Sequence, residues 1–273
     1  MKVFVGKRDV VRVSGDEATS FLQGQISQDI EKLADGASAW SLILQPQGKI
    51  DAWFRITSTG VENSYVLDVD AGYGEALLAR LNRFKLRTKA DLTLETWDWH
   101  TFRGEESDEK VAVAVEGAFV VTTAGDSGIY DVIGPTLEAP NEETLSADEF
   151  ERIRIEEMIP AMGSELTEDT IPAEAGVVDM SVSFTKGCYT GQELVARVDS
   201  RGNNTPRRLA RVAGDGSASV GDELQIDDAI VATLTSVANG PDDFVALGYV
   251  KRSAYEATTA TLGDRTVTVD LSS

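Results

Sequence analysis

The chain has 273 residues, of which 42% are hydrophobic, so it can bury a sizeable core in one to three domains. Its net charge of −21 argues against a general nucleic-acid binder, which needs a basic surface to displace counterions. No run of 18 apolar residues occurs, and charges within the first nine positions are unlike a signal peptide. These features predict a cytoplasmic protein with no membrane partner.

The predicted elements of the first 100 residues are a helix over 16–23, strands over 40–44, 50–56 and 65–69, a helix over 74–84 and a strand over 92–97. Ser14-Gly15-Asp16-Glu17 has the spacing of a capping box, which places the first helix. Gln45-Pro46-Gln47-Gly48-Lys49 is a turn sequence that predicts a hairpin between the first two strands. Apolar residues at helical spacing predict the second helix.

The predicted elements of the remainder are strands over 111–115 and 118–122, a helix over 146–158, and strands over 208–212, 223–226, 229–237, 244–250, 257–262 and 266–271. Ser146 is the predicted N-cap of that helix. Residues 159–179 hold two prolines and two glycines and few periodic apolar residues, which indicates a long loop that is either functional or wrapped across the surface. The short strands after Pro206 predict a small antiparallel barrel or sandwich, so the fold class is α+β.

The chain contains one cysteine, Cys188, and one histidine, His100. A single cysteine excludes an intrachain disulfide and any zinc or iron–sulfur site held by several cysteines of one chain. One histidine excludes a two-histidine metal site, and a Ser-His-Asp triad would depend on His100 alone. We therefore predict no resident metal, and we expect His100 at the polar end of a strand.

Basic residues gather in two segments of this acidic chain. Residues 80–90 hold five basic residues and no acid, and residues 183–211 hold six basic residues and two acids. These islands predict a site for an anionic small molecule. Alternatively, their side chains pair with nearby carboxylates, and charge counting leaves both interpretations open.

Lys186-Gly187-Cys188-Tyr189-Thr190-Gly191-Gln192-Glu193 places glycines beside reactive and hydrogen-bonding side chains. Glycine lets a backbone approach a ligand closely. The N-terminus of a helix expected to begin at Glu193, together with Lys186, would favour the thiolate form of Cys188. Alternatively, Cys188 is a small buried hydrophobe, as free cysteines usually are, and residue types alone do not decide between these readings.

These eight residues resemble the signature of the YgfZ-type folate-binding proteins, which are iron–sulfur-maturation relatives of the T-protein (aminomethyltransferase) of the glycine cleavage system. Other similar segments follow in the family's order from about residue 20 to residue 210. They are Phe21-Leu22-Gln23-Gly24-Gln25 with Asp29, Pro46-Gln47-Gly48-Lys49-Ile50, Arg83-Phe84-Lys85-Leu86-Arg87, Arg154 to Pro160, Glu165-Leu166-Thr167, Ile171-Pro172-Ala173-Glu174-Ala175, Arg197 and Arg201-Gly202.

The resemblance implies a T-protein-like fold. It implies an interleaved α+β folate-binding core over 1–90 and 146–205, a β-rich part over 91–145, and a C-terminal antiparallel β-barrel over 206–273. It further implies tetrahydrofolate or a one-carbon derivative as ligand, and transient partnership with iron–sulfur proteins or assembly factors. The family's conserved cysteine falls on Cys188.

T-proteins carry two adjacent acids on their N-terminal hairpin, and here the corresponding pair is Asp51-Ala52. Aminomethyl transfer needs a carboxylate beside the reacting folate nitrogen, and at most one remains. Three functions therefore stay open: an accessory protein for iron–sulfur clusters, an aminomethyltransferase or demethylase, and a module that senses or sequesters folate. Whether any reaction is turned over is left undecided.

The predicted site joins the signature to residues that suit the pterin and the carboxylates of folate. The functional groups are Cys188 and Asp51, and the ligand-binding residues are Lys186, Tyr189, Gln192, Glu193, Arg197, Arg201, Trp53 and Arg87. Trp53 and Phe184 are candidate walls of the pterin slot, although a tryptophan more often belongs to the core, which is the alternative for Trp53. Asp51 faces either the ligand or solvent.

Overall fold

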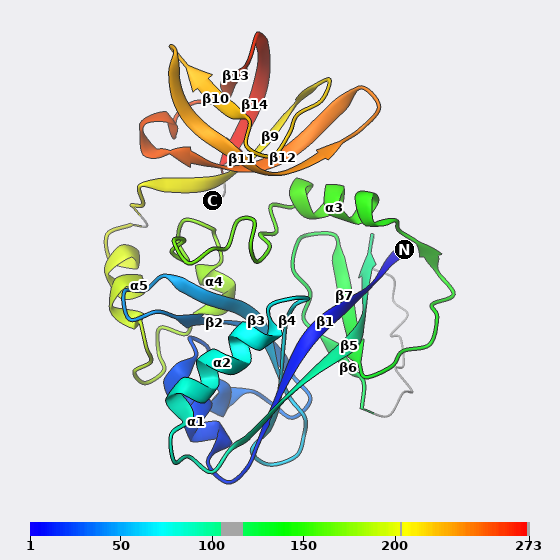
Figure 1. Ribbon diagram of the computed structural model, residues 1–273, viewed down its shortest axis with the longest axis vertical. Coiled ribbons are helices and arrows are strands. Elements are labelled where there is room, and N and C mark those ends of the chain that lie inside the picture. Colours follow the sequence, from blue (N-terminus) through cyan, green and yellow to red (C-terminus); the bar gives the residue numbers. More distant parts are fainter. Residues whose placement is uncertain (105–116, 203, 272–273) are drawn as a thin grey trace. The chain divides into compact units, whose positions relative to one another are not determined.

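The computed structural model describes residues 1–104, 117–202 and 204–271, which form two compact units (Figure 1). The first unit comprises Met1–Leu145 and Asp179–Glu193, and the second comprises Ser146–Val178 and Leu194–Ser273. Two short helices, α4 (Val178–Ser181) and α5 (Gln192–Asp199), span the points where the chain passes from one unit to the other. The finer division at residues 90 and 205 stays a prediction.

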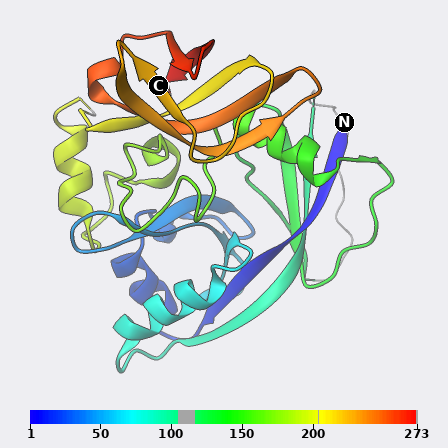
Figure 2. The same ribbon diagram turned by 45° about the horizontal axis from the view of Figure 1, so that its top comes forward.

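One sheet organises the first unit. Its elements are β1 (Lys2–Ser14), α1 (Ala18–Gln25), the 3₁₀ turn η1 (Ile30–Lys32), β2 (Ser38–Leu44), β3 (Ile50–Ser58), β4 (Ser64–Asp70), α2 (Gly74–Lys85), β5 (Asp91–Arg103), β6 (Phe119–Val121), β7 (Gly128–Gly134) and β8 (Glu143–Thr144). The strand order is β2-β3-β4-β1-β5-β7-β6, all antiparallel, and β8 pairs with β1 in parallel. The long strands β1 and β5 form a twisted pair, seen from two sides in Figures 1 and 2.

The β2–β3 hairpin is confirmed. The Gln45 amide donates to Lys49 O at 2.8 Å, and the Gly48 amide donates to Gln45 O at 2.8 Å. Gly48 has φ +80°, in the left-handed region that glycine adopts without steric cost. The turn residues therefore fix the register that places Asp51 and Ala52 near the start of β3.

The capping box predicted at Ser14 is wrong. Ser14 is the last residue of β1, where it pairs with Ser64 and Asp91, and the helix begins four residues later at Ala18. Gly15, at φ +128°, makes the break between strand and helix. A Cβ there would lie 2.6 Å from Lys89 O, so the close backbone approach requires glycine.

Strand β1 was not predicted, although it lies inside the sheet between β4 and β5. Its charged residues Lys7, Arg8 and Asp9 hide the apolar alternation, but Arg8 is buried because it pairs with Asp68. Strand β5 also continues beyond the predicted end at residue 97.

His100 therefore lies within a strand, opposite Val5 and Val132, and is buried rather than at a polar end. Burial lowers the pKa of His100, an effect that Asp98 and Glu142 oppose. The strand predicted over 118–122 is confirmed as the shorter β6, and the strand predicted over 111–115 lies outside the described residues.

A buried charge cluster crosses the sheet of the first unit. The Arg55 guanidinium, fully buried, donates to both Asp68 oxygens at 2.9 and 3.0 Å and to Asp131 Oδ2 at 2.6 Å. Arg8 Nε lies 2.5 Å from Asp68 Oδ2, and Trp99 Nε1 donates to Asp131 Oδ2 at 3.0 Å. Burial disfavours the charged guanidinium, but the two carboxylates outweigh it and raise the pKa of Arg55.

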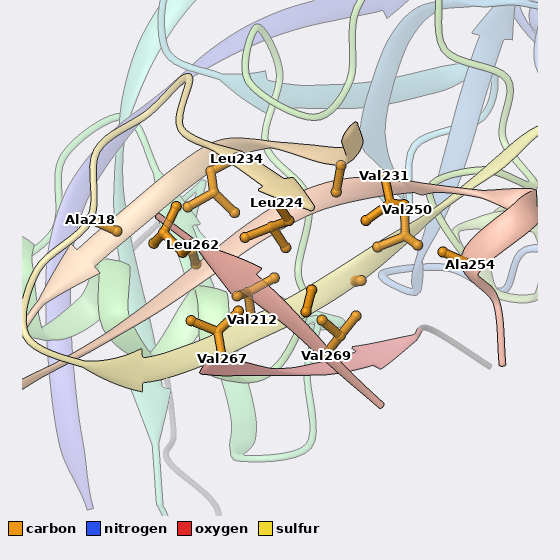
Figure 3. Packing of buried hydrophobic residues seen from close by; sticks show 14 of the residues in the cluster. Val212, Ala218, Leu224, Val231, Leu234, Val250, Ala254, Leu262, Val267 and Val269 are labelled. Atoms are coloured by element: carbon orange, nitrogen blue, oxygen red, sulfur yellow. The ribbon is translucent and has the colours of Figure 1, made fainter. Parts of the chain in front are cut away.

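The second unit is built on a closed antiparallel barrel. Its elements are α3 (Ala147–Glu156), β9 (Arg207–Asp215), β10 (Glu223–Ile226), β11 (Ala229–Asn239), β12 (Asp243–Lys251), the 3₁₀ turn η2 (Arg252–Ala254), β13 (Thr259–Leu262) and β14 (Arg265–Leu271). The barrel order is β10-β11-β12-β9-β14-β13, with β13 pairing back to β10. Figure 3 shows its core of small aliphatic side chains, among them Val212, Leu224 and Leu234. The predicted α+β class with a C-terminal barrel is confirmed.

Helix α3 begins at the predicted capping box: Ser146 Oγ accepts from the Glu149 amide at 3.2 Å, and Glu149 accepts from the Ser146 amide at 2.8 Å. The helix ends at Glu156, and Met158 two residues later has φ +53°. Ile155 packs against Leu209 and Leu247 of the barrel.

The long loop predicted after α3 is confirmed, and a buried carboxylate holds it to the barrel. Glu165 is fully buried. Its Oε1 accepts from the hydroxyls of Thr235 and Ser236, both at 2.6 Å. Its Oε2 accepts from Arg154 Nη1 at 3.1 Å and from the Ala161 amide at 3.0 Å. Four donors on one carboxylate offset the cost of its burial and fix the loop.

Among the described residues, no helix is both long enough and apolar enough to cross a membrane.

Candidate functional site

The signature forms an exposed loop in the first unit, followed by α5, which begins at Gln192, one residue before the predicted start. Cys188 is exposed, so the alternative that it is a buried hydrophobe is wrong. Phe184 is also exposed, at 51%, and an added Cβ on Gly187 would meet nothing within 4 Å. The thiol is therefore accessible to molecules in solution.

The chain before the thiol is tied to the end of α1. Ser27 Oγ donates to Ser181 O at 2.6 Å, and the Ser183 amide donates to Ser27 O at 3.0 Å. Trp53 Nε1 donates to Ser181 Oγ at 2.9 Å. Ser27 itself is fixed to β2, because its amide donates to Leu42 O at 3.0 Å. These bonds hold residues 181–183 in place.

The chain after the thiol is tied to the β2–β3 hairpin. Gly191 has φ +83°, and a Cβ on it would lie 2.5 Å from Gln45 O. This close backbone contact explains the second signature glycine. Tyr189 is buried, and burial raises its pKa to about 12. Gln192 Oε1 accepts from the Tyr189 amide at 3.1 Å, while Glu193 is exposed.

Lys186 lies two residues before the thiol and points inward. Its ammonium donates to Gln23 O at 2.8 Å, Ile26 O at 2.6 Å and Gln28 O at 3.0 Å. An ammonium has three N–H donors, so all of them go to carbonyls of the α1 terminus. Burial lowers the pKa of Lys186 to about 8, against the opposing charges of Asp29 and Glu31.

The lowered pKa of Lys186 gives a pH prediction. In the folded chain this pKa is about 8, below the ordinary value of 10.5, so between these values the unfolded chain binds the extra proton. The contribution of Lys186 to the free energy of unfolding therefore increases as the pH rises through this window, and is lost as the pH falls through 8. Urea unfolding should show that the wild type gains stability relative to Lys186→Met between about pH 8 and pH 10.5. A difference that stays constant with pH would contradict this.

Asp51 forms an ion pair rather than standing alone. Arg80 Nε donates to Asp51 Oδ2 at 2.7 Å, and Arg80 Nη2 donates to Leu44 O at 3.0 Å. The Arg80 guanidinium also lies over the Phe84 ring, 3.9 Å from its centroid. The Asp51 side chain remains 25% exposed, whereas Ala52 is buried. The hairpin thus presents one carboxylate, already paired with a guanidinium.

Trp53 belongs to the core of the first unit. It is 3% exposed and stacks on Trp40 with ring centroids 4.2 Å apart. This agrees with the alternative that it is a core residue. Its predicted place in a pterin slot, like that of the exposed Phe184, stays a prediction.

In each basic island, some residues form the ion pairs that the second interpretation predicts. In the first, Arg80 pairs with a carboxylate, but no ion pair to Arg83, Lys85, Arg87 or Lys89 lies among the described residues. In the second, Arg207 pairs with Glu174 at 3.1 Å and Arg211 with Asp270 at 2.8 Å. Arg197 and Arg201 are exposed in the second unit, so their predicted contact with ligand remains a prediction.

Sequence reasoning missed Arg80 and Ser27 as residues that organise this region. Arg80 was visible only as one member of a basic island, and its pairing with Asp51 joins positions 29 residues apart. Ser27 lies just after the Phe21–Gln25 segment, and nothing in its sequence context marks its bond to Ser181, 154 residues away.

Other features of the described chain do not suit the predicted ligand. A cavity of about 410 Å³ in the second unit is lined by Asp148, Glu149, Glu151, Arg152, Val237, Ala238 and Asn239. Its three acids would repel the carboxylates of folate, and it contains none of the predicted site residues. Across the described ranges, no group of three His, Cys, Asp or Glu side chains could hold a metal ion.

The fold is shared with a solved aminomethyltransferase. The glycine cleavage system aminomethyltransferase T from Bartonella henselae matches with a TM-score of 0.77 and 17% identity, over 100% of this chain and 86% of that one. At this identity the match shows the fold, and it confirms the predicted T-protein-like class. No family model matches the chain.

Several sequence relatives are similar to most of this chain. A Haemophilus influenzae protein is 28% identical over 247 residues, which cover 84% of this chain and 81% of that protein. The tRNA-modifying protein YgfZ of Vibrio vulnificus is 24% identical over 75% of this chain, and the mitochondrial iron–sulfur cluster assembly factor IBA57 homolog of Mycosarcoma maydis is 26% identical over 72%. The alignments span 67% and 53% of those two proteins. These matches confirm the predicted resemblance to YgfZ-type proteins, and the fold shared with the Bartonella henselae protein agrees with their relation to the aminomethyltransferases.

Proposed function

We propose that the chain is a tetrahydrofolate-binding accessory protein that supports the assembly or repair of iron–sulfur clusters. The observation that carries the proposal is the exposed Cys188 in the signature loop, with the chain fixed on both sides of it. Relatives named as iron–sulfur cluster assembly factors support this role. One thiol is too few to hold a cluster alone, so its contact with a cluster is transient or shared with a partner protein.

The proposed folate ligand suits the charge of the first unit. Folate ends in glutamate carboxylates, and Arg83, Lys85, Arg87 and Lys89 present basic groups that no described carboxylate neutralises. At physiological ionic strength, screening reduces the repulsion from the distant acids, so this local charge dominates at short range. We therefore assign the glutamate tail to this island, with Arg87 as one of its contacts.

Calorimetry with reduced folates tests the ligand. We expect the purified chain to bind tetrahydrofolate, and to bind its triglutamyl form more tightly because the longer tail meets more of the basic island. Arg87→Gln should weaken binding of the triglutamyl form several-fold, since an exposed ion pair contributes roughly 0.2–1 kcal/mol. Arg12→Gln is the matched control, because Arg12 is an exposed arginine of the same unit that pairs with Glu95. No binding at high micromolar concentration would refute the folate ligand, and equal loss in both variants would refute the role of Arg87.

A second candidate function is a folate-dependent aminomethyltransferase or demethylase, which the shared fold favours. The hairpin argues against it, because only Asp51 is present and Arg80 already occupies its Oδ2. A general base for this chemistry would have to leave that ion pair. Formation of methylene-tetrahydrofolate from an aminomethyl donor by the purified chain would establish the aminomethyltransferase function.

The proposed partners are iron–sulfur proteins or their assembly factors, bound transiently through the loop that carries Cys188. We expect the protein to act in the cytoplasm. Fungal relatives are named as mitochondrial proteins, so the same role is assigned to a different compartment in those organisms.

A further inference from the structure

We propose that Lys186 is a positioning residue that anchors the signature loop to the C-terminal end of α1 and so holds Cys188 in a fixed, exposed place. The proposal concerns how the loop is built and does not require folate or iron–sulfur chemistry. The residues of the segment 184–188 differ in their exposure to solvent. Phe184, Thr185, Gly187 and Cys188 are exposed, and Lys186 alone is partly buried.

Two of the three acceptors that Lys186 reaches, Gln23 O and Ile26 O, are backbone groups at the helix end, where carbonyls lack intrahelical partners. Gln23 lies in the last turn of α1, Ile26 is its C-cap residue, and Gln28 follows two residues later. The last carbonyls of a helix have no intrahelical donor, and the helix dipole places partial negative charge there. Basic side chains commonly satisfy this end, but α1 has none in its last turn. Lys186 supplies the missing cation from about 160 residues away in the sequence.

The anchor completes a set of three attachments. The Ser183 amide is bonded to Ser27 O before the exposed run, and Gly191 lies against the hairpin after it. Without Lys186, the run from 184 to 188 would be held only at its two ends. With Lys186 fixed, Cys188 lies between two held positions: Lys186 two residues before it and the buried Tyr189 directly after it. The position of the thiol then follows from the fold of the first unit.

The chain has a single cysteine, so a nitroxide spin label attached to Cys188 reports on the loop without the introduction of a new cysteine. In Lys186→Met we expect faster motion of the label and about ten-fold faster hydrogen exchange of the Ser183 amide, as loss of several hydrogen bonds implies. Lys186→Arg should restore both values towards the wild type, because arginine keeps the charge and the donors.

Lys251→Met is the matched control, since Lys251 also donates to a backbone carbonyl, that of Ile230, but in the second unit. It should change neither readout. The proposal is overturned if Lys186→Met leaves label motion and exchange unchanged, or if Lys251→Met changes both equally.

If Lys186→Met does not fold, two other measurements test whether Lys186 anchors the loop. Lys186→Gln keeps N–H donors but is shorter and uncharged, so its label should move faster than in the wild type, and unchanged motion would overturn the anchor. In the unaltered protein, NMR of ¹⁵N-labelled lysine should show one ammonium whose protons exchange slowly with water. Absence of such a signal would overturn the anchor. Both measurements use the purified chain, so their outcome is independent of folate binding and of any iron–sulfur role.

Discussion

Replacing Arg55 by leucine is expected to destabilise the first unit by about 3–5 kcal/mol, the typical cost of breaking a buried ion pair from one side. Arg55 is fully buried and provides three donors to Asp68 and Asp131. Its loss leaves Asp131 without an ion-pair partner among the described residues, and Asp68 with Arg8 alone. The carboxylates are almost fully buried, so water cannot replace the guanidinium.

Urea unfolding followed by tryptophan fluorescence measures this effect. Trp40 and Trp99 both contact arginines of the buried charge cluster, so the signal reports on the unit that is altered. Arg12→Leu is the matched control, because Arg12 is exposed and pairs with Glu95 at 3.5 Å. An exposed pair contributes about 0–1 kcal/mol, so the control should remain close to the wild type. An Arg55→Leu protein within 1 kcal/mol of the control would show that the cluster is dispensable for stability.

Replacing Cys188 by alanine is expected to abolish support of iron–sulfur enzymes without unfolding the protein. The thiol is exposed, so its removal should change the free energy of unfolding by no more than about 0.5 kcal/mol. The measurement compares iron–sulfur enzyme activities under oxidative stress in cells that carry the wild-type chain or the variant as their only copy.

The variant Cys188→Ser tests whether the thiol chemistry itself is required. Serine keeps the size and a polar hydrogen but is a far weaker nucleophile and metal ligand than a thiolate. A role in thiol or cluster chemistry therefore predicts that serine fails as alanine does. Full activity of either variant, at the protein level of the wild type, would refute a thiol-based role for this residue.

The barrel could be predicted from the sequence because its signals are local. Each strand is a short run, and turns such as Gly221-Asp222 and Gly263-Asp264 lie between runs. The capping box at Ser146 is likewise contained within four residues. The box at Ser14 has similar spacing but was wrong, because pairing with β4 and β5 keeps Ser14 in the strand. Tertiary pairing there outweighs the local preference.

The site was predictable in part. Glycines around one cysteine predicted close approach of the backbone to a ligand, and this stays a prediction. What the structure shows is that Gly191 lies against the backbone at Gln45. The partners of Lys186 could not be foreseen, because they are backbone carbonyls, which carry no sequence signal, and lie 158–163 residues away. Strand β1 was missed for a related reason. Its charged residues suggest a solvent-exposed segment, and their partners Asp68 and Asp98 are distant in the sequence.

The exposure of Cys188 also determines how two copies of the chain can be covalently joined. Each copy has one cysteine, so the only disulfide that can join two copies links their two Cys188 residues. Such a link places the same surface of both copies face to face and is compatible with two-fold symmetry. A third copy cannot be added, because no thiol remains. Oxidised preparations should therefore contain monomers and a single dimer species, with no longer disulfide-linked chains.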